Sequence, residues 1–339
     1  MRKCILAILI ASLLLAGCNF PSRFSMTNQT PLPLGYSSGG PTPTPFQPMN
    51  TTPGSDEEQQ SSGTATETQP APTPTPYADL GFELPKSMIN ILLLGSDRRA
   101  DNSFRTDVIM MLSLDPEKGT ASLISFPRDL YVSIPGVGME RVNTSQEFGG
   151  FPLTQETFKL NFGVKPGYYM LTDFNGFTGI VDTLGGIDVY AAYNLTDVCD
   201  LPQAVDKMCT IYAGQNHFDG QTALWYARSR KSTSDFDRTR RAQEVITAIF
   251  QKLMSLNAVN RAPELYDMFK TSVETNIPLT TIVPLLPLFL KIYNDPSIVK
   301  RFAIGPKEVT SYVVPESGAQ VLLPIQDSVM AIMREALSQ

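Results

Sequence analysis

Three short apolar runs in the middle of the chain predict neighbouring β-strands. They are INILLLGSD at 89–97, DVIMMLSLD at 107–115 and TASLISFP at 120–127. Each run is mainly apolar and ends in Gly, Pro or acidic residues, which is the pattern of a short strand buried in a sheet. Residues 116–119, with sequence PEKG, form the turn that joins the second run to the third.

Helical patterns alternate with further strands beyond these runs. Helices are expected near 152–161 and over 174–184, 220–228 and 235–256, and strands near 168–172 and over 185–190. The last helix starts with a capping box, in which Ser234 is followed by Asp237 three residues later. This alternation predicts an α/β fold with helices on both faces of the sheet. Residues 257–339 are expected to be a mostly helical extension of unknown role, which leaves 81–256 as the main domain.

Residues 1–17 have the features of a bacterial export signal. Arg2 and Lys3 precede the apolar run CILAILIASLLLAG, which ends at Cys18 and is shorter than the roughly 20 residues of a membrane-spanning helix. Because LAGC resembles the lipobox of bacterial lipoproteins, we expect cleavage before Cys18. Its diacylation would anchor the exported protein at the outer face of the cytoplasmic membrane. A plain secretory signal is the alternative.

The segment that follows the signal predicts a tether. Residues 18–80 begin with the lipidated cysteine and are rich in Pro, Thr and Ser, in stretches such as PTPTPFQP and QPAPTPTP. Such a composition cannot bury enough apolar surface to offset the entropy lost on ordering. We therefore expect a disordered, polyproline-leaning chain between the membrane and the folded part.

Overall composition limits the possible functions. The 339 residues are 42% hydrophobic and 18% charged, with a net charge of −6, which suits a folded protein and not a disordered acidic one. The single histidine, His217, excludes a site that needs two His ligands. The acidic balance and the expected export both argue against nucleic-acid binding.

Export also suggests the state of the cysteines. Cys4 is removed with the signal and Cys18 is acylated, so Cys199 and Cys209 remain. A disulfide across this short loop is the expected state in an oxidising compartment. A redox-active pair is the alternative, but such pairs are usually spaced as CxxC.

Two aspartates flank the loop between the first two predicted strands. Asp97 ends the first strand and Asp107 begins the second, with Arg105 just before it. If the strands are neighbours, both carboxylates meet at one edge of the sheet, where open α/β sheets bind ligands. Two oxygen ligands without His or Cys suit Mg²⁺, or Mn²⁺, completed by substrate phosphate. Turn-capping aspartates beside solvated arginines are the alternative.

Arginines cluster in two further places. Arg128 and Asp129, in the sequence FPRD, follow the third strand and are either site residues or a structural ion pair. The segment ALWYARSRKSTSDFDRTRRAQ carries the arginines that most suggest phosphate binding, Arg228, Arg230, Arg238 and Arg241. Guanidinium groups pair bidentately with phosphate and stabilise a transferring phosphoryl group. A solvated helix face is the alternative. The motifs HExxH and GxxxxGK[ST] are absent, and His217 is expected to be a packing or capping residue.

These residues lie in motifs that resemble the LytR–CpsA–Psr (LCP) family of bacterial cell-envelope proteins. The motifs occur in order over 90–246: NILLLGSD, FRTDVIMMLSLDP, ASLISFPRDLYVSIPG, RVNTSQEFGG, DFNGFTGIVDTLGGIDVY, HFDGQTALWYARSR and DFDRTRRAQEVI. The resemblance implies an α/β/α sandwich around a mixed sheet, with an apolar pocket for a polyprenyl chain. It also implies a phosphotransferase that moves a glycopolymer from a polyprenyl-pyrophosphate carrier to peptidoglycan and releases polyprenyl phosphate.

Site residues follow from the same resemblance, position by position. Asp97 and Asp107 match the family's Mg²⁺-associated aspartates, and Arg105, Arg128 and Asp129 match catalytic positions. Pyrophosphate binding is implied for Arg141, Arg228, Arg230, Arg238, Arg241 and Gln243. We hypothesise that Asp129 is a general base. Ala242 departs from the family pattern, which commonly has Gln there, and this puts fine positioning of the substrate in doubt.

Two other functions fit the same residues. One is a hydrolase that releases the glycan to water from the same site. The other is a lipoprotein that only binds envelope glycolipids, although binding alone does not need the carboxylate pair. Older descriptions of the family as a transcriptional attenuator do not suit a domain outside the membrane.

Overall fold

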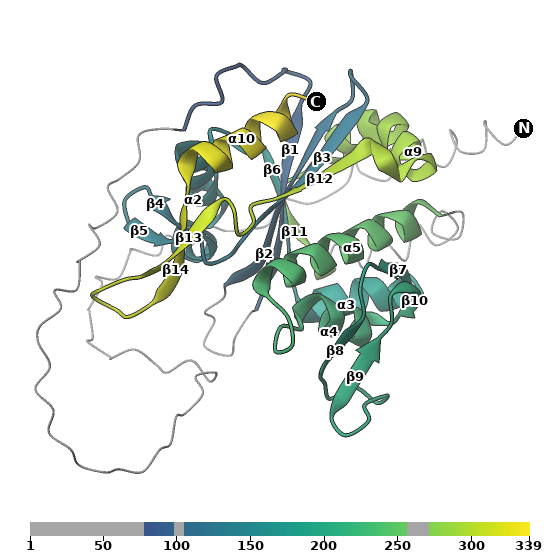
Figure 1. The fold of residues 1–339 in the computed structure, drawn as a ribbon. Helices are drawn as coiled ribbons and strands as arrows, with labels where there is room; N and C mark the ends of the chain where they lie inside the picture. The colour runs from purple at the N-terminus through teal and green to yellow at the C-terminus, as the bar shows by residue number, and fades with distance from the viewer. Residues whose placement is uncertain (1–77, 98–104, 256–270) are drawn as a thin grey trace, which may run out of the picture. The chain divides into compact units, whose positions relative to one another are not determined.

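The computed structural model describes residues 78–97, 105–255 and 271–339 (Figure 1). The expected signal at 1–17, Cys18 and nearly all of the tether lie outside these residues. Within the described ranges, no helix is both long and apolar enough to cross a membrane.

A six-stranded mixed sheet forms the centre of the fold. Its strands run in the order β11 (Glu274–Thr275), β6 (Tyr168–Asp173), β1 (Ile89–Ser96), β2 (Thr106–Asp115), β3 (Thr120–Phe126) and β12 (Val299–Ala303). Strands β1, β2 and β3 form an antiparallel meander, as the three apolar runs predict. Strands β6 and β12 are each parallel to their inner neighbour, β1 and β3 respectively.

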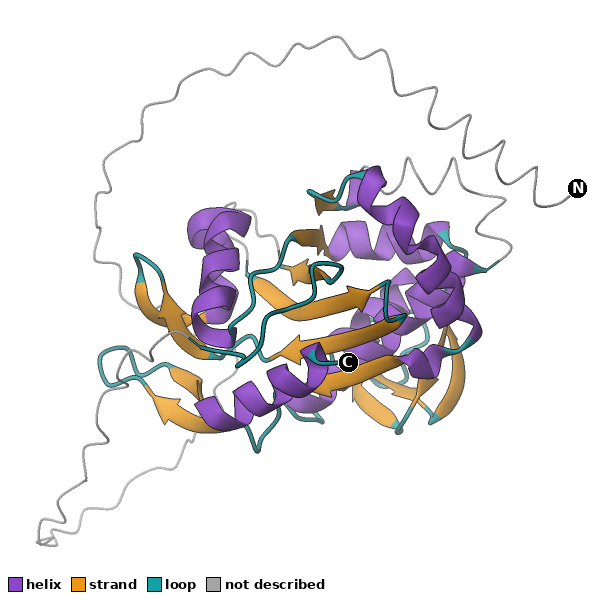
Figure 2. Ribbon diagram, turned by 90° about the horizontal axis from the view of Figure 1, so that it is seen from above, coloured by secondary structure: helices purple, strands orange, loops and turns teal. Residues whose placement is uncertain are grey.

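Helices cover both faces of this sheet (Figure 2). Helices α2 (Ser145–Phe162) and α10 (Gln326–Leu337) pack on one face, and α5 (Asp235–Met254) and α9 (Leu286–Asn294) on the other. Successive strand residues point to opposite faces: Leu92 packs in the α2–α10 core, whereas Leu93 packs on the α5–α9 side. Burial on both faces explains why the central strands are nearly continuous apolar runs. The expected α/β/α sandwich is confirmed.

A smaller cluster of elements packs against the outer side of α5. It comprises α3 (Phe174–Thr183), β7 (Ile187–Ala191), β8 (Leu195–Val198), β9 (Met208–Ile211), β10 (Gly214–Phe218) and α4 (Gly220–Arg228). Its apolar core includes Ile187, Phe218 and Val245 of α5. The Cys199–Cys209 disulfide closes the β8–β9 hairpin with 5.7 Å between Cα atoms, as expected. His217 pairs through Nδ1 with Asp188 Oδ1 at 2.7 Å and is exposed.

The C-terminal region is part of the fold and not a separate, mostly helical extension. Besides α8 (Leu279–Ile282), α9 and α10, it supplies β11 and β12 to the central sheet and forms the hairpin of β13 (Val309–Val313) and β14 (Gln320–Pro324). Three 3₁₀ turns, Val142–Thr144, Val283–Leu285 and Pro296–Ile298, link other elements. Strand β12 forms its hydrogen bonds by pairing with the distant β3, and its own short sequence does not by itself predict a strand. The expected boundary at 256 is therefore wrong.

Two local elements also differ from the sequence prediction. The Gly- and Pro-rich segment after β3 contains the hairpin of β4 (Tyr131–Ile134) and β5 (Gly138–Arg141), for which no strands were predicted. Helix α2 begins at Ser145, before the expected 152. A short first part is joined to the expected helix across a kink at Gly149 and Gly150, just before Pro152. Gly150 takes φ +61°, a left-handed conformation that suits glycine.

Candidate active site

Arg128 links the end of β3 to the start of β2. Its Nη1 donates to Oδ1 of Asp107 at 2.5 Å, and its Nε lies 3.4 Å from Oδ2 of Asp129. The side chains of Arg128 and Asp107 are 19% and 16% exposed, so the pair is shielded but open to a ligand. Burial by itself would lower the pKa of Arg128, but attraction to Asp107 and Asp129 raises it above its usual value. The guanidinium therefore stays positively charged.

Arg238 approaches the same place from α5. The capping box fixes the start of the helix, because Ser234 Oγ accepts from the backbone N–H of Asp237 at 3.1 Å. Arg238 Nη2 pairs with Asp235 Oδ1 at 2.8 Å and the residue is 7% exposed. Burial lowers the pKa of Arg238, and the nearby Arg128 lowers it further. Two guanidinium groups are thus held close together, which favours binding of an anion between them.

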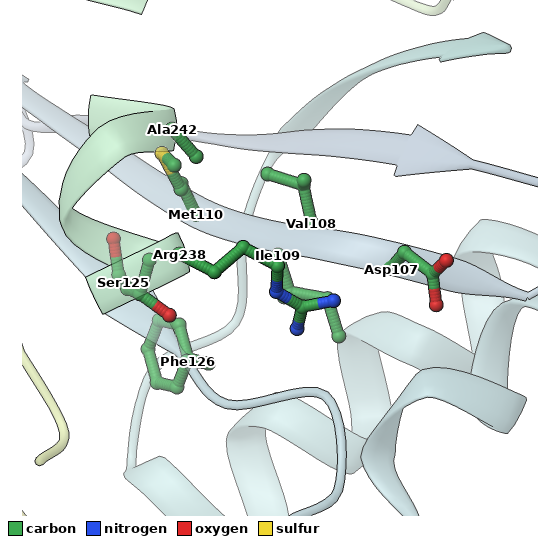
Figure 3. A pocket seen from close by; sticks show the side chains of 9 residues that line it. Asp107, Val108, Ile109, Met110, Ser125, Phe126, Arg238 and Ala242 are labelled. Carbon is green, nitrogen blue, oxygen red and sulfur yellow. The ribbon is translucent and has the colours of Figure 1, made fainter. Parts of the chain in front are cut away.

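A small pocket lies where these groups meet. Residues of β2, β3 and α5 line it: Asp107, Val108, Ile109, Met110, Ser125, Phe126, Arg238, Thr239 and Ala242. Figure 3 shows the guanidinium of Arg238 extending from α5 toward the end of β2 that carries Asp107. The pocket therefore combines one carboxylate and one buried arginine with an apolar floor.

Asp97 and Arg105 face each other across the end of the β1–β2 hairpin. The backbone N–H of Asp97 donates to Arg105 O at 3.0 Å, and Oδ1 of Asp97 accepts from the Arg105 N–H at 2.8 Å. Asp107 is two residues beyond Arg105, at the bulge where the register of β1 and β2 shifts. Both aspartates therefore lie at the same end of this strand pair. The sequence prediction that these strands are neighbours is confirmed.

These residues fit Mg²⁺ through the chemistry of their donors. Both aspartates supply hard oxygen ligands, and Arg128 engages Oδ1 of Asp107. The described residues include no cluster of three or more His, Cys, Asp or Glu side chains able to hold a metal. Mg²⁺ is usually held by one or two carboxylates and completed by water and substrate phosphates. The pair suits such an ion and does not form a full protein cage.

Arg141 contacts Asp129 in the loop after β3, and it also contacts the β13–β14 hairpin. Its Nε lies 3.3 Å from Oδ1 of Asp129, and its Nη2 donates to the backbone oxygen of Gln320 in β14 at 2.9 Å. The backbone N–H of Leu322 donates to Asp129 O at 2.9 Å. Asp129 thus lies between two guanidinium groups, and both its side chain and its backbone are held.

Arg228 and Arg230 are exposed at the end of α4 and in the loop after it. The guanidinium of Arg228 lies over the ring of Phe174, 3.9 Å from its centre. This cation–π contact orients the arginine without neutralising its charge. Both residues remain accessible to an anionic ligand.

Two of the expected pyrophosphate-binding residues are used elsewhere. Arg241 is 1% exposed, and it donates from Nε to Tyr226 O at 2.8 Å and from Nη2 to Ser229 O and Thr233 Oγ1. Gln243 Nε2 donates to Ser125 Oγ at 2.7 Å and to Phe302 O at 2.8 Å. Arg241 therefore holds the α4–α5 loop, and Gln243 joins α5 to β3 and β12. The expectation of direct pyrophosphate contact is corrected for both.

A larger apolar pocket lies beside the polar one along the same sheet face. It has a volume of about 70 Å³ and lies between the sheet and helices α5 and α9. Alternate residues of β2 line the two pockets in turn, Val108 and Met110 the polar one and Leu112 and Leu114 the apolar one. On α5, Ala242 is followed at helical spacing by Ile246 and Phe250. The sequence analysis did not name the residues that line the apolar pocket. The apolar residues that recur every four positions along α5 were the signal that could have indicated them.

Known proteins are similar to this chain in sequence and in architecture. Residues 49–318 match the model of the LytR_cpsA_psr family. The chain is 28% identical over 222 residues to the polyisoprenyl-teichoic acid–peptidoglycan teichoic acid transferase TagT of Bacillus subtilis (strain 168), covering 64% of this chain and 69% of TagT. It is 30% identical over 193 residues to the regulatory protein MsrR of Staphylococcus aureus (strain COL), covering 56% and 57% respectively.

The fold agrees with a solved structure as well. The crystal structure of B. subtilis TagV superposes with a TM-score of 0.61 at 23% identity, covering 75% of this chain and 99% of TagV. The family match spans the site residues, the central sheet and β12. The chain belongs to the LytR_cpsA_psr family, as the resemblance of its motifs implied.

Proposed function

We propose that this protein is a phosphotransferase that attaches a glycopolymer from a polyprenyl-pyrophosphate carrier to peptidoglycan and releases polyprenyl phosphate. The relatives' names support the reaction class, since TagT is named as a teichoic acid transferase acting between a polyisoprenyl carrier and peptidoglycan. The activity would serve assembly of the cell wall.

The observation that carries the proposal is that a charged pocket and an apolar one lie next to each other along one face of the sheet. Arg238 and Asp107 line the first, and the second lies further along the same face of β2. A polyprenyl pyrophosphate has an anionic head joined directly to a long apolar chain. Its head would lie beside the arginines while its chain would occupy the space beneath α5, so one ligand matches both pockets.

Charge gives each arginine its role. Arg128 and Arg238 would neutralise pyrophosphate oxygens as the bond to the departing polyprenyl phosphate breaks. Arg228 and Arg230, which are accessible, would extend this positive surface toward the glycan side. Arg105 stands at the mouth of the site beside Asp97. The acceptor hydroxyl would attack the phosphorus next to the glycan.

Asp129 would orient Arg128 rather than act as the general base. Oδ1 of Asp129 lies 3.3 Å from Arg141 and Oδ2 lies 3.4 Å from Arg128. Both carboxylate oxygens of Asp129 are thus already engaged by arginines. The geometry therefore favours positioning over the proton transfer hypothesised from the sequence.

Mg²⁺ or Mn²⁺ is the proposed cofactor, held by Asp97 and Asp107 together with substrate phosphate. When bound, the cation would neutralise charge on the pyrophosphate. Lipidation of Cys18 is the proposed anchor at the outer face of the cytoplasmic membrane, and it would raise the local concentration of the lipid-linked donor. Cleaved, diacylated protein in the membrane fraction, lost in Cys18→Ala, would test the anchor.

The decisive experiment is transfer of a labelled glycan from a synthetic polyprenyl-pyrophosphate donor to peptidoglycan, with Mg²⁺ and with chelator. The proposal expects metal-dependent labelling of peptidoglycan that is lost in Asp107→Ala. Release of free glycan phosphate without labelling would instead identify a hydrolase. Donor binding without turnover would identify a glycolipid-binding protein.

A further inference from the structure

A second, polar groove lies on the other side of α5 from the charged pocket. It has a volume of about 340 Å³ and is walled by α5, by the antiparallel pair of β7 and β10 and by β12. Its polar lining comes from Asp188, Tyr190, Gln215, Glu244, Gln251 and Arg301. None of these residues has a part in the reaction proposed above. Glu244 accepts from the hydroxyl of Tyr226 at 2.7 Å and pairs with Arg240.

The register of the β7–β10 pair directs the side chains of Asp188, Tyr190 and Gln215 outward. Tyr190 is opposite Gln215 in the β7–β10 ladder, and Asp188 is opposite His217. The intervening residues of β7, such as Val189, point into the core and are buried. As a result the Tyr190 side chain is 69% exposed, an unusual state for a large ring. The ring offers a flat surface at the rim of the groove.

The mixture of groups in the groove selects among ligands. Asp188 is paired with His217 and Glu244 with Arg240, so both carboxylates of the groove already have partners, and the amides and charges do not suit a lipid chain. A saccharide has apolar C–H faces that stack on an aromatic ring and a rim of hydroxyls that both donate and accept hydrogen bonds. Amide and carboxylate groups beside an exposed tyrosine are complementary to both features.

Gln251 provides an independent indication of a missing partner. Its Nε2 is buried and has no hydrogen-bond partner within the described part of the chain. Buried donors of this kind are rare in native structures. Gln251 lines both this groove and the apolar pocket. An acceptor oxygen on a ligand in the groove would satisfy the donor.

We propose that this groove is a saccharide-binding subsite, which takes an oligosaccharide of amino sugars with N-acetyl or carboxylate substituents. Tyr190 supplies the stacking surface, Gln215 and Gln251 bond the hydroxyl and amide groups, and Arg301 pairs with a carboxylate. Arg301 is already oriented, since its Nη2 donates to Thr247 Oγ1 at 3.2 Å. Only the identity of the saccharide rests on the proposed function.

Glu244 follows Arg238 by six residues, which is about 9 Å along the axis of α5, and faces the opposite side of the helix. A saccharide bound in the groove would therefore reach the charged pocket by extending around α5. Two glycans meet at such an enzyme, the peptidoglycan acceptor and the polymer of the donor. Both have the chemistry that the groove accepts.

The test is calorimetric titration of the full chain with two lipid-free probes, soluble peptidoglycan glycan strands and the free glycopolymer. The variants are Tyr190→Ala and Gln251→Leu. Tyr212→Ala is the matched control, because Tyr212 is also 69% exposed but is not part of the groove lining. We expect at least about fivefold weaker binding of one probe for both variants, and a change below about twofold for Tyr212→Ala. The probe that responds identifies the saccharide.

Absence of binding by the unaltered chain to either probe would overturn the proposal, as would an unchanged affinity in Tyr190→Ala. The readout needs no donor lipid and no turnover. Tyr190-dependent binding without any glycan transfer would leave the subsite standing and remove the proposed function. Glycan transfer by Tyr190→Ala with unaltered KM values for acceptor and donor would leave the proposed function standing and remove the subsite.

Discussion

Arg128 and Asp107 form a 2.5 Å ion pair between the loop after β3 and the start of β2. Each residue holds the other in place at the edge of the charged pocket, although they lie 21 residues apart in the sequence. In the proposed reaction, donor phosphate and Mg²⁺ would each engage one member of this pair. The pair thus keeps an arginine and a carboxylate oriented before substrate binds.

Replacing Arg128 should impair chemistry more than folding. In Arg128→Ala we expect glycan transfer to fall at least about 100-fold, because an oriented donor facing developing charge contributes about that much. Arg128→Lys should recover part of the rate, since it keeps the charge but not the planar fork. Initial transfer rates measure the effect, with the thermal midpoint as the folding control. Unaltered transfer in Arg128→Ala would remove this arginine from the site.

Arg241 and Arg238 should separate into a structural and a functional arginine. In Arg241→Met the buried carbonyls of Tyr226 and Ser229 lose their donor, so we expect the free energy of unfolding to fall by about 2–4 kcal/mol. Arg238→Met should lose more transfer activity and less stability. Urea unfolding and transfer rates, measured on both variants, test this order. The reverse order would restore the pyrophosphate role first assigned to Arg241.

Metal binding should depend on Asp107 even without turnover. Mn²⁺ provides a spectroscopic probe, and its affinity in the presence of inorganic pyrophosphate can be followed by electron paramagnetic resonance. We expect Asp107→Asn to weaken binding at least about tenfold, since one of the two carboxylate ligands becomes a neutral amide. Asp327→Asn, which alters an exposed carboxylate in the first turn of α10, is the control. Equal Mn²⁺ affinities in the two variants would contradict the metal assignment.

Loss of the disulfide should loosen one hairpin. The Cys199→Ser/Cys209→Ser variant removes a bridge between residues ten positions apart. The chain-entropy model gives a loss of about 3 kcal/mol for a loop of this length. Amide hydrogen exchange should accelerate over 195–211 and stay unchanged in the central sheet. Unaltered exchange in the hairpin would show that its hydrogen bonds hold it without the bridge.

The cap of α4 should give a pH-dependent term in stability. Asp219 Oδ1 accepts from the backbone N–H of Thr222 at 2.8 Å, and its hydrogen bonds to Thr222 lower the pKa of Asp219. A lowered folded-state pKa means that the stabilisation is present above the unfolded pKa and is lost as the pH falls through the folded one. Asp219→Ala should therefore cost about 1 kcal/mol at pH 7 and less in acid.

Asp219→Asn separates the cap from its charge. Asparagine also caps helices but does not titrate in this range, so the acid-dependent part of the difference should disappear while the cap persists. Urea unfolding at pH 7 and at pH 3 measures both variants. A deficit in Asp219→Ala that is the same at both pH values would mean that the carboxylate charge does not contribute.

Local sequence determined the elements whose signals are short-range. The three apolar runs correspond to β1, β2 and β3, because strands buried on both faces need apolar side chains at successive positions. The Ser234–Asp237 capping box set the start of α5, since both of its hydrogen bonds lie within three residues. The disulfide was predicted from the two cysteines that remain once Cys4 of the expected signal and the expected lipidation site Cys18 are set aside.

Contacts between distant residues decided the rest. Strand β12 is short and carries the exposed Lys300 and Arg301, so only its pairing with β3 makes it a sheet strand. The charge of Arg241 suggested phosphate binding, yet its position on the helix places it against backbone carbonyls of the preceding loop. A motif fixes which side chains are available. The packing of α5 on the sheet determines which of them face the pocket and which hold the structure together.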